Sequence, residues 1–145
     1  MSRRTSIVSA LVDKINLIDG QQPYHINLFS NAHAKLKFWD EINQFPAVYA
    51  TPGSESREYL PGNLIWAYLG VSIKIYTKGE KSKEDLEFLL EDIEKVINSN
   101  RVLTYDTDLG YQTTEILVIS VTTDEGLLMP YSVGEINLQI RYQLV

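Results

Sequence analysis

Twelve residues in the middle of the chain alternate without a break between two kinds of side chain, and this stretch limits the possible fold most strongly. A period of two is typical of a β-strand, and at about 3.3 Å per residue the strand would be roughly 40 Å long. Gly70 lies near its middle, where we expect a β-bulge. One face is apolar and the other is polar or aromatic: Ile65, Ala67, Leu69, Val71, Ile73 and Ile75 against Trp66, Tyr68, Gly70, Ser72, Lys74 and Tyr76.

Two other segments have the spacing of amphipathic helices. We expect the first helix at residues 5–18, ended by Asp19 and Gly20, and the second from an N-cap at Ser82 to residues 98–100. Asp85 would complete a capping box, and the other acidic residues of this helix, Asp92 included, would cover its solvent face. The buried stripes would be Ile7, Val8, Leu11, Val12 and Ile15, and then Leu86, Leu89, Leu90, Ile93 and Ile97.

Shorter strands are expected around these elements. Residues 116–123 are rich in β-branched side chains, and residues 133–144 alternate between apolar and polar positions. Strand-like patterns also occur at residues 24–29, 35–38 and 45–50. The order of elements favours a single α+β domain over residues 1–145, with a mixed or mainly antiparallel β-sheet and two helices packed on one face.

The chain offers few of the side chains that enzymes use. It has no cysteine and only two histidines, His25 and His33, neither of which lies in a nucleophile motif. The segment from Asp106 to Gly110 has its glycine and the later Glu115 at the wrong spacing for a calcium loop. We therefore expect no catalytic residue, no metal and no cofactor, and a protein that is not an enzyme.

The charge of the chain argues against binding to nucleic acid. The net charge is −6 and the sequence pI is about 4.9, and the 13 basic residues are scattered along the chain. No stretch approaches the roughly 18 apolar residues of a membrane span. The first helical segment contains Asp13 and Lys14, so it lacks the unbroken apolar core of a signal peptide. We expect a protein made in the cytosol that keeps its N-terminus and does not enter a membrane.

Residues 51–62 contain two prolines and two glycines and almost no apolar periodicity. This composition predicts a long exposed loop that is mobile in the free protein. The second face of the long strand, with Trp66, Tyr68 and Tyr76, allows two interpretations. It is either a second core face beneath other residues or an interface, where tyrosine is enriched.

Several of these segments together resemble the tail terminator (tail completion) proteins of long-tailed bacteriophages. The likeness lies in residues 70–76 followed by 86–93, in the opening residues 4–15, and in residues 123–128 with the strand that follows. The order and spacing agree along nearly the whole chain. The sequence is most similar to terminators of siphophages, which have long non-contractile tails.

The resemblance implies a structural protein of the virion. Family members form a six-membered ring that caps the head-proximal end of the tail tube, stops its polymerisation and offers a surface to the head connector. The expected partners are therefore further copies of this chain in a homohexameric ring, the tail tube protein and head-to-tail connector proteins. Genomic DNA would pass through the lumen without specific binding. Assembly would take place in the host cytoplasm.

Two groups of residues are candidates for the contacts between subunits or with the tube. Glu55, Arg57, Glu58 and Tyr59 combine opposite charges with one aromatic ring in the expected loop, and Gln139 and Arg141 lie on the polar face of the last strand. Two alternatives remain at this point. One is another neck or head-to-tail joining protein, and the other is a small-molecule binding module that uses the aromatic face as a pocket.

Overall fold

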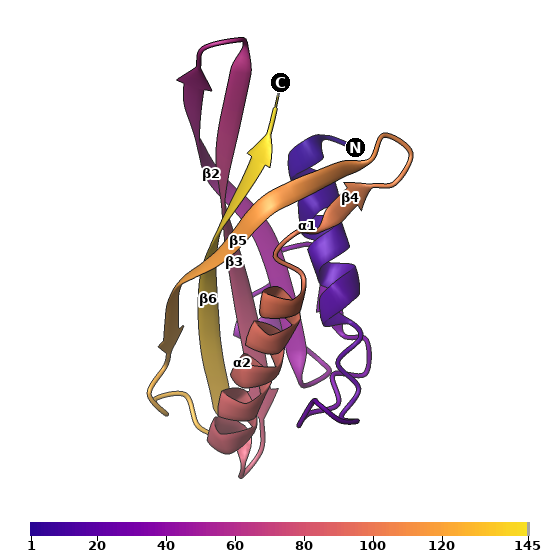
Figure 1. Ribbon diagram of the computed structural model, residues 1–145. Coiled ribbons are helices and arrows are strands. Elements are labelled where there is room, and N and C mark those ends of the chain that lie inside the picture. The colour runs from indigo at the N-terminus through magenta and orange to yellow at the C-terminus, as the bar shows by residue number, and fades with distance from the viewer. Residues whose placement is uncertain (145) are drawn as a thin grey trace.

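A computed structural model describes residues 1–144 of the chain (Figure 1). The elements follow in the order α1 (Arg3–Ile15), β1 (Ala32–His33), the short 3-10 helix η1 (Trp39–Glu41), β2 (Ala47–Leu60), β3 (Leu64–Lys78), α2 (Ser82–Ser99), β4 (Thr104–Asp106), β5 (Tyr111–Thr123) and β6 (Tyr131–Gln143). The predicted long central strand is confirmed as β3, and the strands predicted near the C-terminus are confirmed as β5 and β6.

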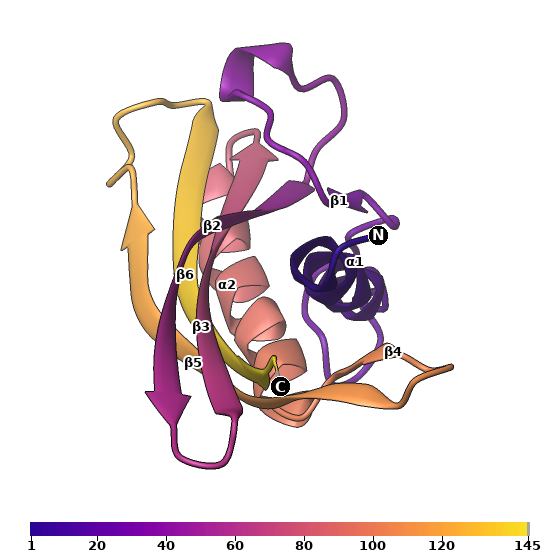
Figure 2. The same cartoon turned by 90° about the horizontal axis from the view of Figure 1, so that it is seen from above.

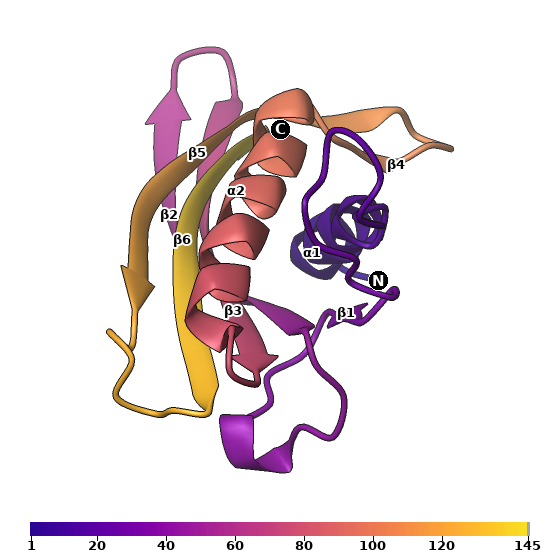
Figure 3. The same cartoon turned by 90° about the horizontal axis from the view of Figure 1, so that it is seen from below.

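The strands form one curled sheet with the order β1-β2-β3-β6-β5-β4. β1 runs parallel to β2, and every other neighbouring pair among the described residues is antiparallel. Figures 2 and 3 show both helices on the same side of this curled sheet: α2 packs on β3 and β6, and α1 packs beside it against β1, β2 and β4 at the two ends of the sheet. The prediction of an α+β fold with a mixed sheet and two helices on one face is confirmed.

The main core lies between the helices and one face of the sheet. Every residue of the two predicted helical stripes is buried there, together with the apolar faces of β3 and β6. Burial of each such aliphatic side chain contributes about 1.5–3 kcal/mol relative to exposure. The contact between α2 and β6 is close, because a Cβ at Gly134 would lie 3.0 Å from Cδ1 of Leu86.

Both helices begin at other residues than the sequence predicted. α1 starts at Arg3, because the Ser2 hydroxyl accepts a hydrogen bond from the Thr5 backbone N–H at 3.2 Å and caps the helix there. Ser82 is the first residue of α2 and makes no capping bond, so the expected capping box is wrong. Its hydroxyl is buried instead and lies 3.0 Å from the Ser132 hydroxyl of β6.

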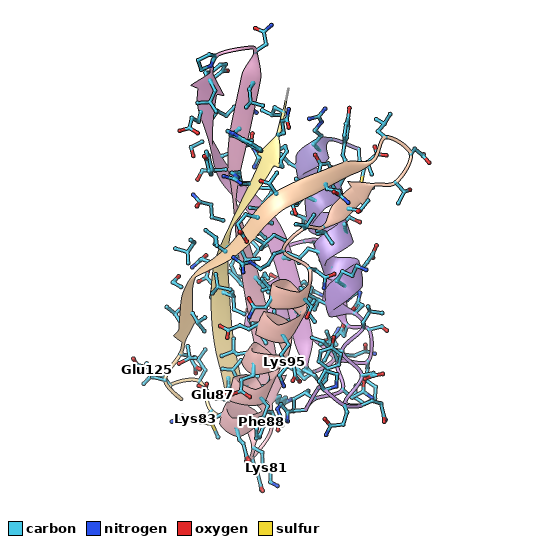
Figure 4. All side chains as sticks on the ribbon, in the orientation of Figure 1. Lys81, Lys83, Glu87, Phe88, Lys95 and Glu125 are labelled. Atoms are coloured by element: carbon cyan, nitrogen blue, oxygen red, sulfur yellow. The ribbon has the colours of Figure 1, made fainter. Side chains whose placement is uncertain are left out.

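Residues 16–31 form a strap across the helices, and the strand expected at residues 24–29 is wrong. The strap is held by Asp92 of α2, which was expected on the solvent face but is fully buried. Its carboxylate accepts hydrogen bonds from the backbone N–H groups of His25 (2.9 and 3.0 Å) and Ile26 (2.9 Å). The solvent face of α2 instead carries residues such as Glu87, Phe88 and Lys95 (Figure 4).

A second, smaller apolar cluster lies on the opposite face of the sheet. It consists of Ile42, Ala47, Tyr49 and Tyr76, with Phe45 and Val133 packed against it. The segment after β1 covers this cluster, and the Tyr76 hydroxyl donates a hydrogen bond to the Lys37 carbonyl at 2.8 Å. That segment contains η1 in place of the strand expected at residues 35–38. Tyr76 therefore follows the core interpretation, whereas Trp66 and Tyr68 remain half-exposed.

The predicted loop at residues 51–62 is wrong, because most of it belongs to β2. β2 pairs with β3 from Ala47↔Tyr76 to Leu60↔Leu64, and the two strands form a hairpin that projects beyond the rest of the chain (Figure 1). We call residues 55–69 of this hairpin the arm. With two strands and no layer packed on it, the outer part of the arm has both faces in water. Its sequence therefore lacks the apolar alternation that identifies a half-buried strand.

We expect replacement of Asp92 by Ala to lower the free energy of unfolding by about 2–4 kcal/mol, because backbone donors of the strap lose their buried charged acceptor. Chemical denaturation measures this loss. Replacement of Glu87 by Ala, on the exposed face of the same helix, is the matched control and should cost about 0.5 kcal/mol or less. Equal losses in the two variants would contradict the role given to Asp92.

Candidate interaction surface

The sheet face turned away from the helices carries the candidate interaction surface. We call it the outer face, and the strand register places its residues in rows across β2, β3, β6 and β5. Ser56, Tyr68, Arg141 and Glu115 form one row, and Glu58, Trp66 and Gln143 form the row above it on the arm. Beside Gln139 the face is hollowed into a shallow groove lined by residues such as Ser54, Gly70, Ile119 and Asn137.

A bulge in β2 divides the predicted interface residues between two faces. Pro52 pairs with Val71 and Glu55 with Leu69, so two residues of β2 oppose Gly70 alone. The extra residue shifts the alternation of β2 by one position beyond this point. Glu55, Arg57 and Tyr59 consequently lie on the helix side of the arm, together with Leu69. The expected bulge near Gly70 occurs in the neighbouring strand.

The outer face brings together three of the predicted residues, Glu58, Gln139 and Arg141. The Arg141 guanidinium lies 4.6 Å from the ring centre of Trp66 and donates a hydrogen bond from Nε to the Thr114 hydroxyl at 2.8 Å. The Tyr68 hydroxyl donates to Glu58 at 3.2 Å. These contacts fix aromatic and charged groups in place on a rigid sheet, an arrangement suited to protein recognition.

Two carboxylates near this face have close partners of opposite charge. Lys74 lies 3.7 Å from the Glu135 carboxylate, which also accepts a hydrogen bond from the Ser72 hydroxyl at 2.6 Å. The Arg101 guanidinium donates to Glu115 at 2.6 Å, and this hydrogen bond lowers the pKa of the Glu115 carboxyl. The face therefore presents paired charges, hydroxyls and amides.

Glu55 lies deeper in the molecule than the sequence suggested. Its side chain is 3% exposed, whereas that of Arg57 is 46% exposed. One carboxylate oxygen accepts the Tyr142 hydroxyl at 2.5 Å, and the other accepts Nε and Nη2 of Arg57 at 2.9 and 2.7 Å. Burial and the hydrogen bond to Glu55 raise the pKa of the Tyr142 phenol. Sequence reasoning missed this role of Tyr142, because alternation in β6 indicates burial without naming a partner.

The exposed strand β5 is a further feature that sequence reasoning missed. β4 pairs with β5 only near Tyr111 and Gln112, so within residues 1–144 the rest of this sheet edge carries no further strand. Residues 116–123 contain no charged side chain. Leu117, Ile119 and Val121 are 40%, 59% and 41% exposed. An edge without charge or proline is open to pairing with another chain.

The two histidines make contacts within the chain. The His25 ring lies 4.9 Å from the Phe88 ring, and His33 is bonded to the Asn31 side chain at 2.8 Å. Burial, with the nearby Lys35 and Lys37, lowers the pKa of the His33 imidazole. Across residues 1–144, no three His, Cys, Asp or Glu side chains gather in a way that could hold a metal ion. No helix in that range is long and apolar enough to cross a membrane.

Comparison with known proteins identifies the class to which this surface belongs. The family described as bacteriophage tail tube terminator protein matches residues 1–145, and the chain belongs to this family. The tail tube terminator protein p142 of Escherichia phage T5 is 39% identical over 153 residues, which span 99% of this chain and 95% of the phage protein. The resemblance seen in the sequence is thereby confirmed, and the chain is a structural protein of the phage tail.

A solved structure shares the fold at much lower identity. A chain in the virion of a native gene transfer agent particle superimposes with a TM-score of 0.63 and 7% identity. The match covers 98% of this chain and 99% of that chain. The two chains thus share the arrangement of two helices on a curled sheet although few of their residues are identical.

The pairing of Tyr142 with Glu55 should make stability fall at alkaline pH. Because the pKa of Tyr142 is raised in the folded protein, its contribution is complete below the ordinary tyrosine pKa of about 10 and declines as the pH rises further. We expect Tyr142→Phe to cost about 1–3 kcal/mol near pH 8 and less near pH 11. Urea denaturation of both proteins at the two pH values measures this. A difference in unfolding free energy between the two proteins that is the same at both pH values would contradict this prediction.

Proposed function

We propose that this chain assembles into a ring of six copies at the head-proximal end of the tail tube, where it stops tube polymerisation and provides the surface for head joining. The single observation that carries the proposal is the arm, a two-stranded hairpin that projects beyond one end of the domain (Figure 1). The name of the phage T5 relative, a tail tube terminator, supports it.

The two edges of the sheet support the ring. A ring of identical chains needs contacts between two different surfaces of neighbouring copies. β5 lies near one edge and β2 near the other (Figure 2). Neighbouring strands run in opposite directions in the order β2, β3, β6 and β5, so β5 runs opposite to β2. A rotation about an axis along the strands keeps their directions. β5 of one copy could therefore pair in antiparallel fashion with β2 of the next copy in the ring. The uncharged edge of β5, with Ile119 exposed, is suited to this contact.

The arm is suited to contact the last ring of the tail tube protein. Tyr59 is 72% exposed near the tip on the same side of the arm as Arg57, and Glu58 lies on the opposite side. An exposed aromatic ring flanked by charged groups is the combination that dominates many protein interfaces. Arg141 and Gln139 continue the surface from Glu58 down the outer face.

The opposite end of the domain is the candidate for the head-to-tail connector proteins. The loop between β5 and β6 exposes Leu127 (84%) and Met129 (52%) there, and Glu125 projects beside them (Figure 4). The two ends therefore differ in chemistry, one with a polar and aromatic arm and the other with a loop that exposes large apolar side chains beside Glu125. A terminator that joins two different partners needs such a difference.

Genomic DNA passes through the lumen of the ring in this proposal. The net charge of −6 discourages the phosphate contacts that dominate affinity for DNA. The paired charges of the outer face act in the same direction, because Lys74 already has its carboxylate partner. Assembly takes place in the host cytoplasm.

Shortening the arm tests the proposed function. Residues 58–66 are replaced by Asn-Gly, which joins the directly paired Arg57 and Ala67 by a tight turn. None of the removed residues belongs to the main core, so the domain should fold. In phage complementation with electron microscopy, we expect tubes of uncontrolled length or tails without heads.

The matched control is Leu109→Ser in the hairpin between β4 and β5, which alters another exposed tip at the same end of the domain. It should leave tail length and head joining unchanged. Normal tails from the folded arm deletion would overturn the assignment of the arm as the terminating contact.

A further inference from the structure

The two strands of the arm do not by themselves fix the direction in which it leaves the domain. The ladder between β3 and β6 ends at Trp66↔Gln143, so the outermost residues of the arm have no third strand beside them. An isolated two-stranded hairpin is at best marginally stable in water. Whatever sets the angle of the arm must therefore act at its base.

The base of the arm contains the bulge of β2. Opposite it, a Cβ at Gly70 would lie 3.3 Å from the Ser54 carbonyl oxygen, closer than most side chains approach. Gly70 therefore allows the bulged strand to approach β3 closely. The Gly53 carbonyl, on the bulge itself, accepts a hydrogen bond from the Arg4 guanidinium of α1. Bulges bend and twist a strand, so this one sets the line along which the arm leaves the domain.

Immediately beyond the bulge, Glu55 links the arm to β6. Its carboxylate binds the hydroxyl of Tyr142 from β6 at 2.5 Å and the guanidinium of Arg57 from the arm at 2.7 and 2.9 Å. Tyr142 is itself held, because it is 1% exposed and its ring meets that of Tyr105 edge to face at 6.1 Å. A hydrogen bond to a buried charged group is among the strongest single contacts that a side chain makes.

We propose that Glu55, Tyr142 and Arg57 form a clamp that fixes the direction of the arm in the free protein, so that the arm is already positioned when it meets its partner. The clamp makes Glu55 and Tyr142 positioning residues, whereas Glu58 and Tyr59 form the contact itself. The proposal rests on the proposed function of the arm. It replaces the expectation of a mobile segment, which followed from the incorrect loop assignment. An arm that is ordered in advance loses less conformational freedom on binding.

Hydrogen exchange on the free protein tests the clamp. Tyr142→Phe removes the hydroxyl and keeps the ring in the core, and Glu55→Gln keeps an acceptor for Tyr142 but loses the charge that binds Arg57. We expect Tyr142→Phe to speed exchange of arm amides by about tenfold, and Glu55→Gln by a smaller factor. The arm amides should lose more protection than the amides of the β3–β6 ladder between Ile73 and Lys78, whose exchange follows only the loss of global stability.

The chain provides a matched control on the other face of the same arm. The Tyr68 hydroxyl donates to Glu58 at 3.2 Å, so Tyr68→Phe also removes a tyrosine–glutamate hydrogen bond, but an exposed one. We expect it to change arm exchange by less than about twofold. Equal effects of the two Tyr→Phe variants, or wild-type arm amides that exchange without protection, would overturn the clamp.

Tail assembly then separates the clamp from the proposed function. Faster arm exchange in Tyr142→Phe together with defective termination supports both. Faster exchange in Tyr142→Phe, combined with normal tails from the arm deletion, upholds the clamp and contradicts the role of the arm. Unchanged exchange in Tyr142→Phe, combined with failed termination by the arm deletion, upholds the role of the arm and overturns the clamp.

Discussion

The antiparallel pairing of β3 with β6, 13 residue pairs from Trp66↔Gln143 to Lys78↔Tyr131, is the constraint on which the rest of the structure depends. It aligns the apolar residues of both strands on one face, and this face is wide enough for α2 to pack across it. The second face receives the polar residues in the same register. β3 continues past the end of β6, and the outer part of the arm is that continuation together with the residues of β2 that pair with it.

One inserted residue in β2 then changes what the arm presents. Without the bulge, the serines and Glu58 would face the helix side and Glu55 would face water. With it, Glu55 turns inward to Tyr142, and Glu58 joins the outer face beside Trp66. A single backbone irregularity thus separates a buried structural carboxylate from an exposed one three residues later.

Membership of the tail tube terminator family agrees with a surface organised for contact. Aromatic rings, hydroxyls and paired charges are held by contacts within a sheet that has its own core. The gene transfer agent chain shares this fold at 7% identity. The burial pattern, which many sequences satisfy, therefore sets the architecture, and the specific contacts of each chain are left to its surface residues.

The sequence by itself determined the elements whose burial is periodic. β3, β6 and the stripes of both helices were predictable because alternation or helical spacing of apolar residues states which face is buried. Only the tertiary structure decided the rest. Asp92 is buried because its partners are backbone N–H groups of His25 and Ile26, more than sixty residues away in the chain and not encoded by any side-chain pattern. The arm could not be predicted, because a two-stranded ribbon with both faces in water shows no apolar alternation. The burial of Glu55 could not be predicted either, because the bulge that turns its side chain inward depends on the close approach of β2 to Gly70.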